Sequence, residues 1–177
     1  GRCKDGTVIH VSVTISPIRD ADGGIVGAST IARDITPQVI AKRELSNERS
    51  FLRTLIDTLP DLVWLKDPDG VYLRCNQRFE QFFGATEQAV IGKTDYDFVD
   101  KALADFFREH DRRAMERKGP SVNEEEIGFA SDGHREILET TKIPMLDENG
   151  GLVGVLGIGH DITQRKLGSI DERASTA

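Results

Sequence analysis

The chain of 177 residues lacks the features that mark several large classes of protein. Its two cysteines, Cys3 and Cys75, are too few for a disulfide framework or a cysteine-rich metal site. No apolar run reaches the roughly 18 to 20 residues that a membrane-spanning helix needs. Basic residues are not in excess, since 23 lysines and arginines stand against 30 aspartates and glutamates, for a net charge of −7. That balance argues against nucleic acid or an anionic membrane as a direct partner of this segment.

Sequence motifs of common enzyme chemistries are also missing. There is no glycine-rich phosphate loop followed by Lys-Ser/Thr, no metal-spaced set of His and Cys, and no Ser/His/Asp pattern. We therefore expect no catalytic residues and no metal site in this segment. The low cysteine count favours a reducing, cytoplasmic setting. The first residues carry neither Met nor a signal-peptide pattern, so we expect a fragment of a longer protein.

An internal repeat is the clearest positive feature. Two segments align without a gap at an offset of 127: KDGTVIHVSVTISPIRDADGGIVGASTIARDIT, from Lys4, and SDGHREILETTKIPMLDENGGLVGVLGIGHDIT, from Ser131. The shared residues are mainly turn residues and the closing Asp-Ile-Thr. Each copy predicts a turn, a strand, a turn and a strand, followed by a helix that Thr36 or Thr163 can cap.

The residues between the copies predict an α+β plan. Apolar spacing predicts a helix over residues 37–59, which Pro60 ends. Strands are expected at 62–66 and 71–74, then short helices, a long helix over 100–118, and strands at 121–130, 135–146 and 152–161. This order favours helices gathered on one face of an antiparallel sheet.

Several motifs in this order resemble a PAS domain with its C-terminal PAC motif. They are the Asp-Pro-Asp-Gly turn at 67–70, Asn76, the segment GKTDYDF at 92–98 and the repeated ending. The resemblance implies a PAS fold, a five-stranded antiparallel sheet flanked by short helices, with an N-terminal helix. It divides the chain into the hairpin of a truncated preceding PAS domain (1–36), a linker helix (37–59), a complete PAS/PAC domain (60–166), and a tail or start of an output linker (167–177).

The same resemblance implies a sensory input and signal-relay function in a multidomain bacterial signalling protein. The parent protein would be of the diguanylate cyclase/phosphodiesterase or histidine kinase type. The domain would bind a small molecule, form a homodimer and pass its signal through Asp161, Ile162 and Thr163. From the sequence, Asp161 can pair with Arg165 or Lys166. A ligand-free dimerisation and relay module is the alternative.

Strand alternation places the expected cavity on one face of the sheet. If Asp132-Gly133 and Asn149-Gly150 are two-residue hairpin turns, Glu125 faces Thr140, and Glu125 and Lys142 are diagonal neighbours that can pair or hold a ligand. Their face is mixed in polarity, but its counterparts in the first repeat are apolar, so we expect it to line the cavity. Gly157 and Gly159 would open volume there. The candidate ligand-binding residues are Trp64, Phe98, Phe106, His110, Glu125, Ile127, Thr140, Lys142, Gly157 and Gly159.

The cofactor stays unknown at this point. By resemblance, His110 occupies the place of the axial histidine in oxygen-sensing PAS domains, so a haem gas sensor is one alternative, although a single histidine on an apolar face is commonly a core or rim residue. The segment that begins at Cys75 is similar to the flavin-binding LOV motif with the order of Cys and Asn reversed, which favours Cys75 as a small buried residue. A non-covalent flavin, with Trp64 as the stacking candidate, is a further alternative.

Two apolar surfaces are expected to need a cover. The opposite face of the sheet would be covered by the helix over 45–59 or by a partner chain. Residues 8–32 would pack on a neighbouring surface, that of a second chain, because a two-stranded ribbon is marginal alone.

Overall fold

The computed structural model describes residues 1–174, with side chains described through residue 168. It divides the chain into two compact units, Gly1–Leu52 and a second unit that begins at Arg53. Residues 175–177 of the predicted tail lie outside the described residues. Among the described residues, no helix has both the length and the apolar character needed to cross a membrane.

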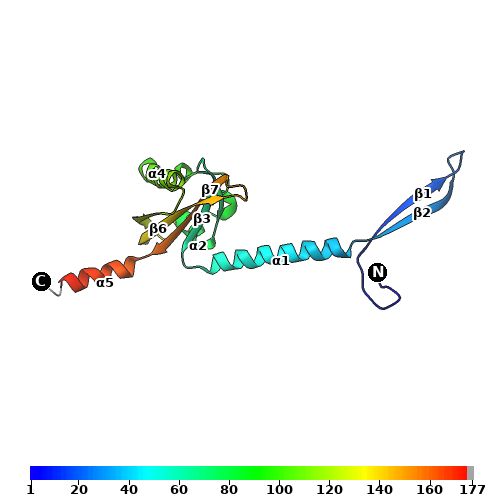
Figure 1. Cartoon of the computed structure of the whole chain (residues 1–177), viewed down its shortest axis with the longest axis horizontal. Helices are drawn as coiled ribbons and strands as arrows, with labels where there is room; N and C mark the ends of the chain where they lie inside the picture. The colour runs from blue at the N-terminus through cyan, green and yellow to red at the C-terminus, as the bar shows by residue number, and fades with distance from the viewer. Residues whose placement is uncertain (175–177) are drawn as a thin grey trace. The chain divides into compact units, whose positions relative to one another are not determined.

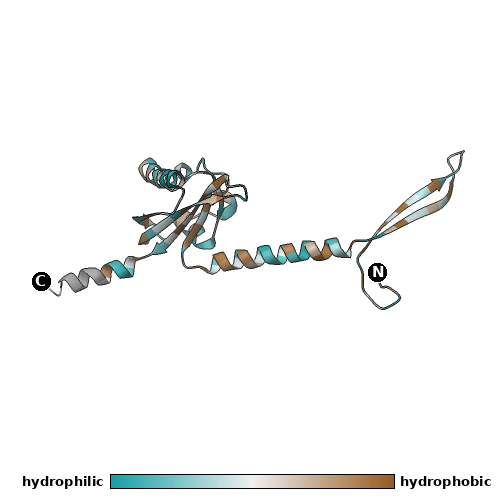
Figure 2. Ribbon diagram, in the orientation of Figure 1, coloured by the Kyte–Doolittle hydropathy of each residue, from teal (hydrophilic) through white to brown (hydrophobic). Residues whose placement is uncertain are grey.

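The first unit holds an antiparallel hairpin and most of a long helix. Strands β1 (Val11–Arg19) and β2 (Ile25–Asp34) pair with each other, and α1 (Thr36–Thr58) follows (Figure 1). Apolar side chains recur along both strands, as Figure 2 shows, and they are exposed; Ile15, for example, is 67% exposed. The packing of residues 8–32 on a second chain therefore stays a prediction.

The second unit is an α+β domain around one sheet. Its strands are β3 (Leu62–Lys66), β4 (Tyr72–Cys75), β5 (Ser121–Gly128), β6 (Arg135–Leu146) and β7 (Leu152–Asp161), in the antiparallel order β4-β3-β7-β6-β5. Its further helices are α2 (Gln77–Phe83), α3 (Glu87–Val90), the 3-10 turn η1 (Asp95–Asp97), α4 (Lys101–Arg117) and α5 (Thr163–Ala174). The predicted fold class and five-stranded sheet are confirmed.

The strand registers agree with the expectation on one side of β6 and differ on the other. Lys142 faces Gly157 on β7, as predicted. On β5, however, Glu125 faces Leu138 instead of Thr140, a shift of two residues. The cause is a longer turn, because the N–H of Phe129 donates to the carbonyl of His134 and four residues lie between them. A shift of two keeps the same side chains on the same face.

The core lies between the inner face of this sheet and the helices. Leu138, Thr140 and Lys142 on β6 are at most 1% exposed, so the prediction that the mixed face points inward is confirmed. The ring of Phe79, on α2, lies 5.2 Å from that of Trp64 on β3. The core cluster also includes Leu62, Tyr72, Phe82, Phe83, Val90, Phe107, Ile127 and Phe129. The opposite face keeps partly exposed apolar side chains such as Leu65 and Ile143, and its cover by a helix or a partner stays a prediction.

Asn76 fixes the start of α2 against the end of α1. Its side-chain oxygen accepts hydrogen bonds from the backbone N–H groups of Phe79 and Val63. Its amide group donates to the carbonyls of Ile56 and Asp61. This one buried side chain therefore ties the helix that enters the domain to its first strand and to α2.

Candidate functional site

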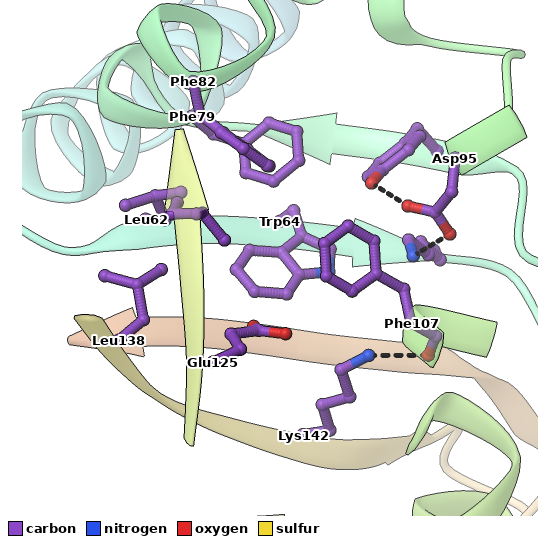
Figure 3. Close-up of a pocket in the computed structure, with 12 residues that line it drawn as sticks. Leu62, Trp64, Phe79, Phe82, Asp95, Phe107, Glu125, Leu138 and Lys142 are labelled. Atoms are coloured by element: carbon purple, nitrogen blue, oxygen red, sulfur yellow. Dashed lines mark hydrogen bonds and ion pairs between the residues drawn. The ribbon is translucent and has the colours of Figure 1, made fainter. Parts of the chain in front are cut away.

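A small cavity lies in the core between the sheet and the helices. Its free space, measured for the centre of a water-sized sphere, is about 10 Å³, which is room for about one water molecule. Figure 3 shows the side chains that converge on it from both sides. The lining residues are Leu62, Trp64, Lys66, Tyr72, Phe79, Phe82, Asp95, Phe107, Glu125, Ile127, Leu138 and Lys142.

The space above the β7 glycines is filled by Trp64. A Cβ atom added at Gly157 would overlap the indole ring, and one at Gly159 would lie 3.0 Å from Leu138 Cδ1. The expectation that Gly157 and Gly159 open volume for a ligand is therefore wrong. The space next to these glycines is occupied by the side chains of Trp64 and Leu138, so the cavity is small.

Four buried charged side chains form a network beside the cavity. Lys66 Nζ lies 2.5 Å from Asp95 Oδ2 and 3.1 Å from Asp111 Oδ2. Lys142 Nζ lies 2.7 Å from Asp111 Oδ1 and donates to the carbonyl of Phe107 at 2.8 Å. All four side chains are at most 2% exposed. Two ammonium groups and two carboxylates thus balance one another in the core.

The ionised form of Asp111 is the centre of this network. Burial alone would raise the pKa of its carboxyl, but the charges of Lys66 and Lys142 outweigh burial and hold that pKa below its ordinary value. Burial lowers the pKa of the Lys142 amine, and Asp111 opposes the shift. Burial and the Asp95 carboxylate raise the pKa of Tyr72 well above its ordinary value, and its hydroxyl donates to Asp95 at 2.6 Å.

Arg108 extends the network to the surface. One guanidinium nitrogen lies 3.4 Å from Asp111 Oδ2, and the other donates to the carbonyl of Pro68 at 3.2 Å. A Cβ atom at Gly70, which has φ +90°, would meet the Arg108 guanidinium at 2.5 Å. The turn between β3 and β4 therefore needs glycine at this position for two reasons, its positive φ and the space that the arginine occupies.

Glu125 has a different partner from the one that the sequence suggested. Its Oε1 accepts a hydrogen bond of 2.6 Å from the hydroxyl of Thr140, whereas the ammonium of Lys142 binds Asp111. The predicted pairing of Glu125 with Lys142 is wrong because the register of β5 is shifted by two residues. The second oxygen, Oε2, is buried without a hydrogen-bond partner, and so is Nε1 of Trp64.

The structure brings four of the ten predicted site residues to the cavity: Trp64, Glu125, Ile127 and Lys142. Thr140 lies fully buried behind Glu125. The other aromatic candidates are not among the lining residues. Phe98 stacks on Phe83 with 4.4 Å between ring centroids, and Phe106 is 37% exposed with its ring 4.2 Å from that of His110.

The site does not fit the two cofactors considered from the sequence. A cavity with room for about one water is far smaller than a haem, and His110 does not line it. Nδ1 of His110 lies 2.8 Å from the carbonyl oxygen of Phe106 on its own helix. Burial, followed by the nearby carboxylates of Glu87 and Glu80, raises the pKa of Cys75 to about 12, which keeps its thiol protonated and unreactive.

Sequence reasoning missed three of the four charged side chains, Lys66, Asp95 and Asp111, together with Tyr72, whose hydroxyl donates to Asp95. A signal for Lys66 was present, because it alternates with Leu62 and Trp64 on one face of a short strand. Asp111 carried a signal as well, because it follows Phe107 by four residues on an apolar helix face. A lysine and an aspartate on two buried faces are a sign of a buried ion pair.

Comparison with protein families identifies the fold. The family described as "PAS fold" matches residues 56–167, well over half of the chain. The chain belongs to the PAS family. A second match, to the family described as "PAS domain", covers residues 1–37 and coincides with the first copy of the repeat.

Similar proteins include two sensor proteins and a diguanylate cyclase. The chain is 31% identical over 119 residues to the aerobic respiration control sensor protein ArcB of Escherichia coli, covering 67% of the chain and 15% of ArcB. It is 33% identical over 157 residues to the virulence sensor protein BvgS of Bordetella pertussis, covering 83% of the chain and 12% of BvgS. A diguanylate cyclase of Vibrio cholerae is 32% identical over 120 residues, covering 66% of the chain and 37% of that protein. The chain thus spans a minor part of each relative.

Two solved structures support the assignment. The PAS domain of Bordetella pertussis BvgS has a TM-score of 0.54 at 31% identity, covering 72% of this chain and 98% of that one. The structure of VqmA bound to DPO has a TM-score of 0.57 at 27% identity, covering 62% of this chain and 55% of that one. A further structure, of Vibrio cholerae VqmA, is a complex with a ligand and DNA.

The end of the PAS domain is a hydrogen-bonded junction. Asp161 Oδ1 accepts from the backbone N–H of Thr163 at 2.8 Å, and Thr163 Oγ1 accepts from the N–H of Ile137 on β6 at 2.9 Å. The predicted partners of Asp161 bind carboxylates on neighbouring strands, Arg165 pairing with Glu139 and Lys166 with Glu124. Ile162 is 2% exposed. Helix α5 is therefore held to the sheet by backbone, side-chain and core contacts.

Proposed function

We propose that this PAS domain senses a small molecule in its core cavity for a multidomain signalling protein. The observation that carries the proposal is that two residues lining the cavity, Trp64 and Glu125, each hold a buried polar atom, Nε1 and Oε2, with no hydrogen-bond partner among the described residues. Leaving such groups unpaired costs free energy that a bound molecule can recover. The similar VqmA, whose structure has been solved with DPO bound, and the sensor proteins ArcB and BvgS support this assignment.

The signal would leave through the junction of β7 and α5. Lys142 and Thr140, beside the cavity, belong to β6, which binds the start of α5 through the N–H of Ile137 and Thr163 Oγ1. A change in the cavity that moves β6 is thereby delivered to α5. His160 Nδ1 also lies 2.8 Å from Asp61 Oδ1, so the segment between α1 and β3 is linked to the same junction.

The relay is tested with Asp161→Ala in the full-length protein, read out by its own phosphorylation or cyclic-di-GMP output. We expect the variant to fold and to lose regulation of that output, because Thr163 loses its acceptor. Glu148→Ala, in the exposed turn before β7, is the matched control and should leave regulation intact. Unchanged regulation in Asp161→Ala would refute the relay.

A ligand-free dimerisation and relay module is the second candidate, favoured by the size of the cavity and by the mutually satisfied charges of the network. Native mass spectrometry of the purified chain separates the two functions. A retained small molecule supports the sensor, whereas bare protein mass in a dimer, unchanged after incubation with cell extract, supports the module. Both candidates place residues 60–166 as the complete domain and 1–36 as part of a preceding one, in a homodimeric cytoplasmic region.

A further inference from the structure

The polar atoms around the cavity specify the chemistry of its ligand. Trp64 is buried, and its indole N–H can only donate a hydrogen bond. The free Oε2 of Glu125 is an acceptor when the carboxyl is ionised. Figure 3 shows the Glu125 side chain below Trp64 among the residues that line the cavity. A ligand that satisfies both must accept one hydrogen bond and donate another.

The cations near the cavity are already committed to carboxylates. Lys66 binds Asp95 and Asp111, and Lys142 binds Asp111 and a backbone carbonyl. Arg108 also pairs with Asp111, so three cations stand against the three carboxylates of Asp95, Asp111 and Glu125. Each of these cations is engaged by a carboxylate, so among the described residues a carboxylate or phosphate ligand would find no uncommitted cation beside the cavity.

A third residue with unpartnered polar atoms lies near Glu125 on β5. Both the amide nitrogen and the amide oxygen of Asn123 are buried without hydrogen-bond partners. Asn123 is two residues before Glu125 on the same face of β5, an edge strand of the sheet, and it faces Thr140 across the ladder. An amide can offer a ligand one donor and one acceptor. Trp64 Nε1 and Glu125 Oε2 together offer the same combination.

We propose that the cavity selects small neutral molecules in which a hydrogen-bond donor adjoins an acceptor, such as carboxamides and lactams, and rejects carboxylates and purely apolar compounds. This inference rests on the proposed sensor function. The present space of about 10 Å³ has room for about one water molecule. A larger ligand would itself have to bond Trp64 Nε1 and Glu125 Oε2, and α4 and the edge strand β5 would have to move apart to admit it.

The test uses the single tryptophan of the chain, whose indole N–H gives one signal in a ¹H–¹⁵N correlation spectrum. Four probes are titrated into the labelled chain: 2-pyrrolidone, N-methyl-2-pyrrolidone, butyrate and benzene. The lactam 2-pyrrolidone has a donor beside its acceptor, the N-methyl compound lacks the donor, butyrate is an anion and benzene is apolar. We expect 2-pyrrolidone to shift the indole signal saturably, with a Kd about tenfold lower than that of each other probe, as for one hydrogen bond lost in a buried site.

A conservative substitution separates recognition from folding. Glu125→Gln retains an oxygen for Thr140 but can present N–H donors to the cavity, so we expect it to weaken 2-pyrrolidone about tenfold and to remove its advantage over the N-methyl compound. The matched control is Glu126→Gln on the opposite face of β5, where the side chain is exposed and pairs with Arg135; it should bind like the parent chain. The dispersion of the same spectra reports whether each variant is folded.

Each other outcome overturns a defined part of the proposal. Equal or tighter binding of benzene, N-methyl-2-pyrrolidone or butyrate overturns the proposed ligand class and leaves the sensor function standing. Equal affinity of Glu125→Gln and Glu126→Gln for 2-pyrrolidone overturns the role of Glu125. If the parent chain is folded and no probe shifts the indole signal, the ligand class is overturned, and the sensor function falls too if no molecule is retained in native mass spectra.

Discussion

The two copies of the repeat share their local hydrogen bonds and differ in their burial. In the first, Asp20 Oδ1 accepts from the N–H of Gly24 at 2.7 Å; in the second, Asp147 Oδ1 accepts from the N–H of Gly151 at 2.7 Å. The glycine at positive φ recurs as Gly23 and Gly150. Both turns are thus built by the same side chain acting on its own neighbours.

The helix junctions are also alike. Asp34 and Asp161 each accept from the N–H two residues later at 2.8 Å. The hydroxyl of Thr36 accepts from the N–H of His10, and that of Thr163 from the N–H of Ile137, 127 positions further along. These contacts need only the hairpin and the helix that follows it, so they form in both units.

Burial differs because it depends on residues far away in the sequence. Val13 and Ile15 of the first hairpin are 54% and 67% exposed, whereas their counterparts Thr140 and Lys142 are fully buried. The second hairpin packs against α4. There the Lys142 ammonium donates to the carboxylate of Asp111, which lies 31 residues earlier in the chain. Local sequence therefore determines the turns, and the rest of the domain determines which face becomes a site.

The largest effect is expected from breaking the charge network that only the second copy has. Asp111→Asn leaves the buried ammonium of Lys142 without a carboxylate, so we expect the domain to lose about 3–5 kcal/mol of unfolding free energy. Urea denaturation monitored by Trp64 fluorescence measures this loss. The exposed Asp105, paired with Lys101 on the same helix, gives the control Asp105→Asn, for which little change is expected. Equal midpoints for the two variants would contradict a structural role for the network.

The next largest effect is expected from replacing a glycine that occupies the same place in both copies of the repeat, Gly27 and Gly154. A Cβ atom at Gly154 would overlap the backbone carbonyl of Lys66, whereas one at Gly27 would lie 3.8 Å from Ile18. We expect Gly154→Ala to destabilise the domain by about 1–3 kcal/mol or more, since the backbone cannot yield as a side chain does. Gly27→Ala should leave the unfolding midpoint of the domain unchanged. Tolerance of both substitutions would show that β3 and β7 are not as close as described.

Acid sensitivity is the smallest of these effects. Because the folded pKa of Asp111 lies below its ordinary value of 3.8, its ionised form stabilises the folded state above that value, and this contribution is lost as the pH falls through the folded pKa. Each unit of pKa difference corresponds to about 1.4 kcal/mol. Denaturation curves from pH 7 to 3 should show a steeper loss for the parent chain than for Asp111→Asn. Parallel curves would contradict the lowered pKa.

The sequence alone was enough to predict the fold and one face of the site. Turn residues and strand alternation predicted which segments are strands, and the resemblance to PAS domains implied the five-stranded sheet. The first repeat, together with that resemblance, indicated which face of β6 points inward. The register of β5 was two residues off, because the four-residue turn before His134 is closed by backbone atoms that any residue carries. The partners of Lys66 are 29 and 45 residues away, so local spacing could not reveal them.

The indole ring of Trp64 lies over Gly157, so a larger side chain at one of these positions requires a smaller one at the other. The indole fills the place that a side chain on β7 would take, so a smaller residue at 64 would free that place without touching Lys66, Asp95, Asp111 or Lys142. Position 64 is thus a size control for the cavity that is separate from its charges. A smaller residue at position 64 would enlarge the cavity, and a larger residue at position 157 would fill it again. We therefore expect residues 64 and 157 to change together in relatives and in designed variants.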